Sequence, residues 1–173
     1  MKKKILVTRK LLAENEEKLK ELFDVKLNSK DELYTSDKII ELSKDCDGIL
    51  SAITDQINKD LIEKLSPTVK IIANFAVGFG NIDINTATKK NIVVTNTPEV
   101  LDDSTADISI LLLLGASRKV LEARRAAELQ NWKWSADFML GKQMSNKRLG
   151  ILGMGRIGRA VAKRARGFNM EIH

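Results

Sequence analysis

The sequence predicts an α/β protein whose core is a parallel β-sheet. Before Pro98, short aliphatic runs alternate with segments of helical periodicity. Repeated strand–helix units of this kind give a parallel sheet with helices on both faces. A glycine-rich turn, Gly153-Met-Gly155-Arg-Ile-Gly158, then joins an apolar run to an alanine-rich stretch. That order is typical of a strand, a tight turn and a helix.

The expected elements follow one another without an internal repeat or a low-complexity segment. Aliphatic and β-branched runs predict strands at residues 5–7, 25–27, 48–53, 69–75 and 92–95. Helical spacing predicts helices at residues 11–23, 31–42 and 82–90, together with one that Asn58 caps before Pro67.

The pattern changes after Pro98. Residues 102–129 contain no proline and hold an apolar block, so they predict one long, partly buried helix. Asp102 and Asp103 lie at its start, where the helix dipole favours negative charge. Residues 130–146 carry several aromatic side chains but show no clear period. We expect this segment to pack either on its own domain or, alternatively, on a partner subunit.

The glycine turn predicts a dinucleotide site. Gly153 permits the tight turn, Gly155 lets the backbone approach a pyrophosphate, and Gly158 lets the helix pack closely on the strand. Backbone N–H groups of Gly155, Arg156, Ile157 and Gly158 would face the pyrophosphate, because unpaired N–H groups at a helix N-terminus favour an anion. The alternative is the same turn in a sheet protein that binds no ligand.

Composition excludes several other classes of function. A single cysteine, Cys46, leaves no disulfide within the chain and no cysteine-based metal cluster, and we expect no metal site. Eight basic residues between 142 and 171, against Glu171 alone, supply the net charge of +6. They fit the solvated face of a helix better than a nucleic-acid surface, because no aromatic side chains are interleaved with them. The longest apolar run, residues 110–114, is too short to span a membrane. No signal-peptide pattern is visible, so we expect a cytoplasmic protein without nucleic-acid or membrane partners.

Three stretches together resemble the D-isomer-specific 2-hydroxyacid dehydrogenase family, and most closely its glyoxylate/hydroxypyruvate reductase branch. They are NFAVGFGNID at residues 74–83, NTPEVLDDSTADISILLLLGASR at residues 96–118 and LGILGMGRIGRAVAKRARGFNM at residues 149–170. The resemblance implies a flavodoxin-like substrate domain over residues 1–98. It further implies that residues 99–173 hold a crossover helix, a dimer arm and the beginning of a Rossmann dinucleotide-binding domain.

The resemblance also assigns roles to individual residues. Backbone N–H groups of Val77 and Gly78 would hold the substrate carboxylate, and Ala52, in the loop after the preceding strand, would line the same cleft. From the residues alone, a glycine-containing turn after a parallel strand exposes such groups, or is simply a turn before the next helix. Thr105 matches a family position near the nicotinamide. Phe138 would reach the edge of the partner's active site in a homodimer.

The activity implied by the resemblance is NAD(P)H-dependent reduction of a small 2-oxo acid, glyoxylate or hydroxypyruvate, to the D-2-hydroxy acid. Either NADPH or NADH would serve, because the residue that distinguishes them is expected about 20 residues after the glycine turn, and the sequence stops just short of it. The family's arginine, histidine and carboxylate also belong to later segments. We therefore expect no catalytic residue in this chain and no activity of the chain alone. The alternatives are a dinucleotide-sensing or corepressor-like protein of the same fold and a dimerising module without a ligand.

Overall fold

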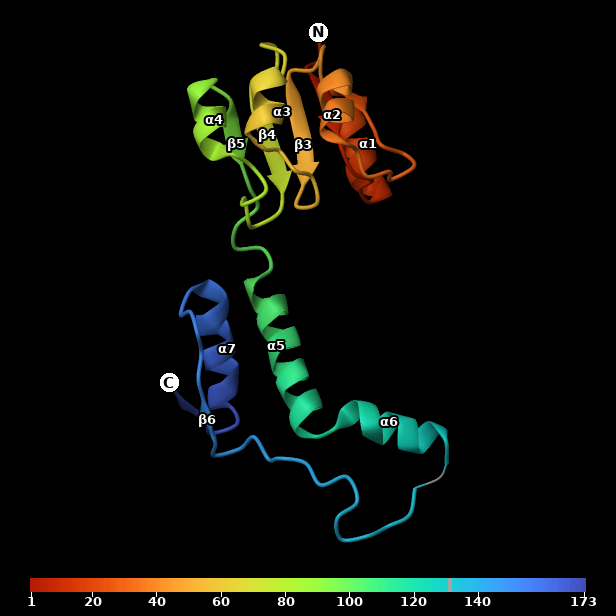
Figure 1. Ribbon diagram of the computed structural model, residues 1–173, viewed down its shortest axis with the longest axis vertical. Coiled ribbons are helices and arrows are strands. Elements are labelled where there is room, and N and C mark those ends of the chain that lie inside the picture. Colours follow the sequence, from red (N-terminus) through yellow and green to blue (C-terminus); the bar gives the residue numbers. More distant parts are fainter. Residues whose placement is uncertain (131) are drawn as a thin grey trace. The chain divides into compact units, whose positions relative to one another are not determined.

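The computed structural model describes residues 1–130 and 132–173. The chain forms two compact units, Met1–Pro98 and Glu99–His173 (Figure 1). Each unit has its own cluster of buried hydrophobic side chains, and the two are considered separately below.

The first unit is built on a five-stranded sheet in which all neighbouring strands are parallel. Its strand order is β2-β1-β3-β4-β5, the flavodoxin-like order of a doubly wound sheet. The predicted α/β class and the flavodoxin-like sheet are therefore confirmed. The strands are β1 (Lys4–Val7), β2 (Asp24–Lys26), β3 (Gly48–Ala52), β4 (Ile71–Phe75) and β5 (Val93–Thr95).

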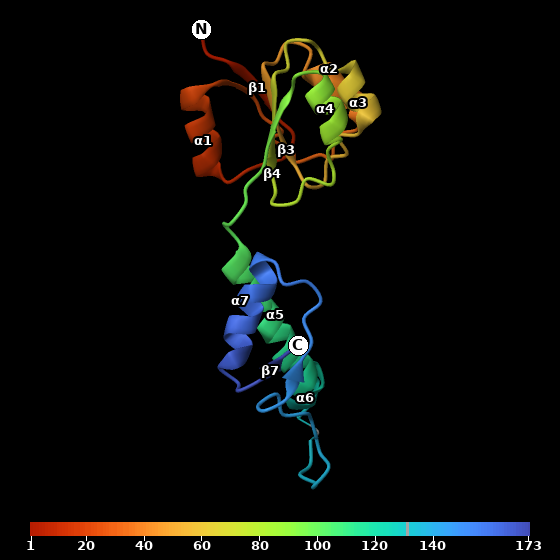
Figure 2. The same ribbon diagram turned by 90° about the vertical axis from the view of Figure 1, so that its left-hand side faces the viewer.

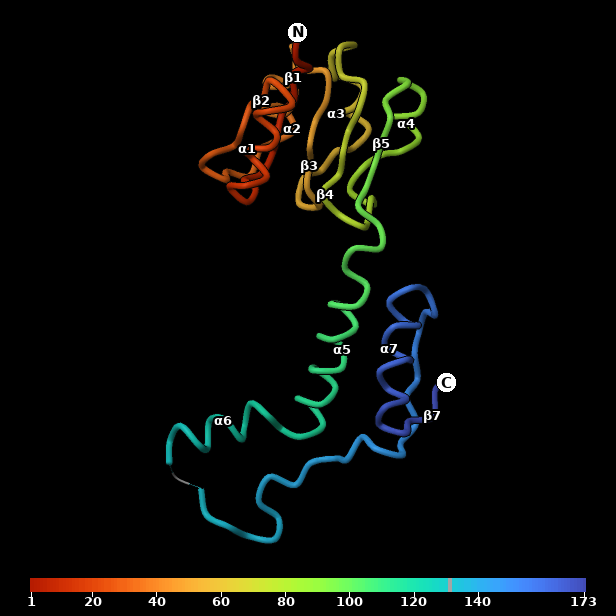
Figure 3. Tube along the Cα trace, turned by 180° about the vertical axis from the view of Figure 1, so that it is seen from behind, coloured from red at the N-terminus to blue at the C-terminus, as the bar shows by residue number. Residues whose placement is uncertain are grey.

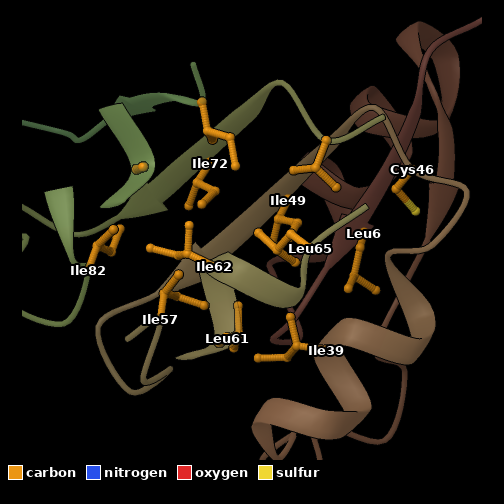
Figure 4. Packing of buried hydrophobic residues seen from close by; sticks show 13 residues of the cluster. Leu6, Ile39, Cys46, Ile49, Ile57, Leu61, Ile62, Leu65, Ile72 and Ile82 are labelled. Atoms are coloured by element: carbon orange, nitrogen blue, oxygen red, sulfur yellow. The ribbon is translucent and has the colours of Figure 1, made fainter. Parts of the chain in front are cut away.

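Helices cover the two faces of this sheet unequally. One face carries α1 (Ala13–Leu22), and the other carries α2 (Ser36–Leu42), α3 (Lys59–Lys64) and α4 (Ile84–Lys89) (Figure 2). The main core lies between the sheet and these last three helices, where strand and helix side chains interdigitate: Leu6, Ile39, Ile49, Leu61, Ile62 and Ile72 (Figure 4). Burial of such side chains is the main stabilising contribution to a sheet of this kind.

Side-chain caps fix where these helices begin. Thr35, Asn58 and Asp83 each accept a hydrogen bond from a backbone N–H in the first turn of α2, α3 and α4. The predicted cap at Asn58 is confirmed. The predicted helix over residues 31–42 is too long, because α2 begins at Ser36, after Thr35, which caps it in an extended conformation (φ −72°, ψ 161°), and Asp31 has a left-handed φ of 55° that a helix of L-residues does not adopt. The Asp31 carboxylate instead accepts hydrogen bonds from Arg9 and from the Lys10 N–H.

The second unit contains α5 (Asp102–Ser117), α6 (Val120–Glu128), β6 (Arg148–Leu149), α7 (Arg156–Arg166) and β7 (Glu171–Ile172). Strands β6 and β7 are parallel neighbours, with the glycine turn and α7 between them in the chain. Helix α5 packs against α7 through Ala106, Ile110, Val161 and Ala165. Strand β6 ends at Leu149, although the Ile151 N–H still donates to the His173 carbonyl.

The predicted single helix over residues 102–129 is wrong, because the helix breaks at Lys119. Its φ of 53° is left-handed, so α5 and α6 run in different directions (Figure 3). At the break the Ser117 carbonyl accepts a hydrogen bond from the Lys142 N–H at 2.7 Å. A Cβ on Gly141 would lie 2.5 Å from that carbonyl oxygen, so only glycine fits. This contact between distant residues leaves no trace in helical periodicity.

Candidate functional site

The first candidate site lies at the carboxyl ends of β3 and β4, the edge where parallel α/β sheets bind ligands. After β4, three successive carbonyl groups are held by donors within the same unit. The carbonyl of Ala76 accepts from the Thr97 N–H at 2.9 Å. That of Val77 accepts from Asn96 Nδ2 at 2.8 Å, and that of Gly78 accepts from Asn74 Nδ2 at 3.0 Å. The loop is therefore fixed through its carbonyl groups.

The N–H groups of the same loop are free to bind a ligand. Among the residues that the structure describes, those of Val77 and Gly78 have no hydrogen-bond partner. Val77 is half-buried and Gly78 is exposed. Adjacent backbone donors held in place at a strand end can bind an anion such as a carboxylate.

A buried amide network supports this loop from beneath. The side chain of Asn74, in β4, is 2% exposed. Its Oδ1 accepts a hydrogen bond from Ser51 Oγ in β3 at 3.1 Å, and its Nδ2 also donates to Asn81 Oδ1 at 3.1 Å. Asn81 Nδ2 in turn donates to the carbonyls of Ala52 and Asp55, at 3.1 and 3.0 Å. The network therefore joins the loops that follow β3 and β4.

Ala52 was expected in the loop after β3, but it is the last residue of that strand, and its backbone polar groups are already in use. Its N–H donates to Asp55 Oδ2 at 2.7 Å, and its carbonyl accepts from Asn81. Asp55, which is 1% exposed, also accepts a hydrogen bond through Oδ2 from Oγ1 of Thr8, the residue that follows β1. Its Oδ1 is buried without a partner in the described part of the chain. Ala52 thus differs from Val77 and Gly78 in having no free N–H to offer.

Sequence reasoning did not identify Asn74 or Asn81 as parts of this site. One signal was present, because Asn74 interrupts the apolar run of a buried strand. A polar side chain in such a position needs hydrogen-bond partners. Which partners it finds depends on the pairing of β3 with β4, which places Ser51 opposite Asn74.

The second candidate site is the glycine turn before α7, where each glycine has a distinct geometric reason. Gly153 has a φ of +101°, which L side chains rarely adopt. A Cβ on Gly158 would lie 2.2 Å from the Gly153 carbonyl oxygen, so the helix can approach the turn only through glycine. A Cβ on Gly155 would meet no atom within 4 Å. Gly155 therefore opens onto free space that a ligand can enter.

Helix α7 begins at this opening. Gly155 is the N-cap, and it has no side chain to accept from the first N–H groups. The N–H groups of Arg156, Ile157 and Gly158 have no hydrogen-bond partner among the described residues. The Arg156 guanidinium lies 3.3 Å from Asp102 Oδ2, so an adjacent acidic residue partly neutralises its charge. Free N–H groups and the helix dipole together favour a phosphate here.

Three other residues of the second unit, Thr105, Phe138 and His173, make contacts of their own. Thr105 is half-buried in the second turn of α5, and its carbonyl accepts from Ser109 Oγ at 2.8 Å. Phe138 stacks on Trp132 with ring centroids 6.0 Å apart and is 37% exposed. Nε2 of His173 lies 3.1 Å from Oε1 of Glu171.

Neither a metal site nor a membrane-spanning helix is found in the described part of the chain. No group of three or more His, Cys, Asp or Glu side chains there is arranged to hold a metal ion. No helix there has the length and apolar character needed to cross a membrane.

Known proteins resemble this chain over almost its whole length. It is 46% identical over 175 residues to a glyoxylate reductase from Korarchaeum cryptofilum, covering 99% of this chain and 52% of that protein. An NAD-binding D-isomer specific 2-hydroxyacid dehydrogenase from Polaromonas superposes on this chain with a TM-score of 0.90 and is 37% identical to it. The match covers 100% of this chain and 55% of that protein. An NADPH-dependent glyoxylate/hydroxypyruvate reductase from Sinorhizobium meliloti, in complex with NADP and malonate, superposes with a TM-score of 0.80 at 29% identity. That match covers 99% of this chain and 52% of the reductase.

The chain spans about half the length of the curated relatives it matches. Residues 5–166 match the family model described as "D-isomer specific 2-hydroxyacid dehydrogenase, catalytic domain". This match confirms the predicted family, and the glyoxylate reductase relatives confirm the predicted branch. The chain belongs to the D-isomer specific 2-hydroxyacid dehydrogenase family.

Proposed function

We propose that the protein carrying this chain reduces a small 2-oxo acid, glyoxylate or hydroxypyruvate, to the D-2-hydroxy acid with NADPH or NADH. The observation that carries the proposal is the pair of N–H groups at Val77 and Gly78, which have no partner among the described residues, on a loop in which the carbonyl groups of Ala76, Val77 and Gly78 are held by donors. The glyoxylate reductase and glyoxylate/hydroxypyruvate reductase relatives support the same substrate class.

Substrate orientation is the contribution of the first unit. A 2-oxo acid carboxylate would accept hydrogen bonds from both N–H groups, which fixes the molecule at its charged end. Its 2-oxo carbon then has a defined place for reaction, and such positioning supplies a large part of enzymatic rate enhancement. Ala52, without a free N–H, would shape the cleft through its methyl group and through its link to Asn81.

The glycine turn fits a dinucleotide pyrophosphate. A phosphate would accept hydrogen bonds from the N–H groups of Arg156, Ile157 and Gly158, with Gly155 leaving room for the approach. Gly153 gives the turn its left-handed φ. Thr105 would lie near the nicotinamide end, as the family resemblance implies. A bound nicotinamide cofactor supplies the hydride.

The protein would act as a homodimer. Large apolar side chains of α5 and α6 are exposed in this chain, as are those of the aromatic arm, residues 132–140. Pairing such surfaces about a two-fold axis removes them from water. Phe138, supported by its stacking on Trp132, is our candidate for the edge of the partner's active site. The basic face of α7 forms ion pairs with α5, such as that of Arg164 with Asp107. Because these acidic partners already neutralise part of its charge, we propose that this face does not bind nucleic acid.

A polypeptide limited to residues 1–173 would not catalyse the reaction. His173 is its single histidine, and the ring is engaged by Glu171. The family resemblance assigns the proton-donating histidine and the substrate-binding arginine to later segments. Absence of a positioned general acid alone lowers a rate by about 10²–10⁴-fold.

Glyoxylate-dependent oxidation of NADPH and NADH by the full-length enzyme tests the proposal. We expect turnover with at least one of the two cofactors, and competitive inhibition by oxalate against glyoxylate. The dinucleotide-sensing alternative predicts cofactor binding by fluorescence titration without turnover of any 2-oxo acid. A dimerising module without a ligand would bind neither cofactor.

A further inference from the structure

We propose that Asn96 is a positioning residue, whose side-chain amide sets the direction of the Gly78 N–H toward the substrate carboxylate. The inference rests on the proposed function, because it concerns the same loop, but nothing in that proposal gives Asn96 a role. Asn96 follows directly on β5, whose last residue, Thr95, pairs with Ala73 of β4.

The argument starts from peptide planarity. A trans peptide group is rigid, so the carbonyl of one residue and the N–H of the next point in opposite directions. A donor that holds the Val77 carbonyl therefore also fixes the direction of the Gly78 N–H. That donor is Asn96 Nδ2, at 2.8 Å.

The neighbouring peptide group is held in the same way. The Thr97 N–H donates to the Ala76 carbonyl at 2.9 Å, which fixes the direction of the Val77 N–H. Asn96 and Thr97 thus clamp two successive peptide groups, and these two groups carry the free N–H donors. One clamp is a backbone N–H, which only a proline substitution would remove, but the other is a side chain. Asn96 is therefore the position at which the alignment of the pair can be tested.

Asn74, in β4, holds a different peptide group of the loop. It holds the Gly78 carbonyl, and by the same planarity argument this fixes the N–H of Phe79. Asn74 is also fully enclosed and engages Ser51 and Asn81, so its substitution would disturb the joined loops as a whole. Asn96 is half-buried and makes one hydrogen bond to this loop. Its substitution is the cleaner perturbation.

The experiment compares Asn96→Ala with the parent in the full-length enzyme. Oxalate inhibition of glyoxylate reduction reports carboxylate binding, and fluorescence titration reports NADPH binding. We expect the Ki of oxalate and the KM of glyoxylate to rise about tenfold, because a hydrogen bond to a charged group loses its alignment. The Kd of NADPH should stay within about twofold of the parent value.

Two further variants control the comparison. Thr95→Ala alters the adjacent residue, whose side chain has no hydrogen bond among the described residues, and should leave the oxalate Ki within about twofold of the parent. Asn96→Asp keeps the shape of the side chain, but an ionised carboxylate cannot donate to the Val77 carbonyl. It should weaken oxalate binding at least as much as Asn96→Ala does.

Several results would overturn the inference. One is an unchanged oxalate Ki in folded Asn96→Ala, and another is an equal loss in Thr95→Ala. Oxalate bound directly to the Asn96 amide in a crystal structure would replace positioning by direct contact. If neither Asn96 variant folds, Asn96 serves the fold alone and the inference is wrong. A parent enzyme that neither binds oxalate nor reduces glyoxylate contradicts the proposed function itself, which is a distinct outcome.

Discussion

Replacing Gly155 with valine should weaken cofactor binding without unfolding the protein. A Cβ at Gly155 meets no atom within 4 Å, so the fold has room for the larger side chain. The backbone there has φ −75° and ψ −161°, which lies in the extended region that valine adopts readily. The added atoms would therefore occupy only the space through which a pyrophosphate approaches the N-terminus of α7.

The size of the effect follows from the hydrogen bonds that would be lost. A hydrogen bond to a charged group contributes about 1.5–3 kcal/mol. Losing one bond between a phosphate and an N–H group of α7 would raise the Kd of NADPH roughly 10- to 150-fold. Fluorescence titration of the full-length Gly155→Val enzyme measures this directly, with a thermal melt to show that it is folded.

Gly158→Ala is the matched comparison, because Gly158 lies in the same turn but backbone atoms fill the space where its Cβ would lie. Its Cβ would lie 2.2 Å from the Gly153 carbonyl oxygen, so the backbone must shift, at a cost of about 1–3 kcal/mol in the free energy of unfolding. We expect Gly158→Ala to lower stability and Gly155→Val to leave it nearly unchanged. An unaltered NADPH Kd in folded Gly155→Val would refute the assignment of this turn to the cofactor.

Three other predictions concern stability and assembly. Hydrogen bonds from Arg9 lower the pKa of Asp31 from 3.8 to about 2. The ion pair therefore stabilises the fold above about pH 4, and this stabilisation is lost as the pH falls toward about 2. In Asp31→Asn the free energy of unfolding should depend less on pH between about 4 and about 2. The same pH dependence in the variant and the parent would contradict this prediction. Gly141→Ala should speed amide exchange of Lys142, because its Cβ would lie 2.5 Å from the Ser117 carbonyl oxygen that this N–H engages; unchanged exchange would contradict that contact. The full-length enzyme should sediment as a dimer, and a monomer at high micromolar concentration would rule out the proposed apolar interface.

The periodic features of this fold could be predicted from the sequence, because they depend on local pattern. Strand positions before Pro98, the cap at Asn58 and the distinct roles of Gly153 and Gly158 all follow from residue type and spacing. The start of α2 and the break between α5 and α6 could not. The start of α2 depends on the cap at Thr35, and the break depends on the left-handed Lys119 and on the contact of Ser117 with the distant Lys142.

The candidate site divides in the same way. The loop of Val77 and Gly78 could be located, because a glycine-containing turn after a buried strand is visible in the sequence. The groups that hold it could not, because Asn96 and Asn74 act through donors that meet the loop only in the folded sheet. The engagement of the Ala52 N–H by Asp55 is likewise a tertiary contact, and no spacing rule indicates it.

A crystal structure of the full-length enzyme with NADPH and oxalate tests the central claim most directly. Oxalate stands in for the 2-oxo acid, because its carboxylate presents the same pair of oxygen acceptors. The account predicts one carboxylate within hydrogen-bond distance of the backbone N–H groups of both Val77 and Gly78, with these two residues positioned as in this structure. Oxalate held only by side chains elsewhere, with both N–H groups left free, would contradict it.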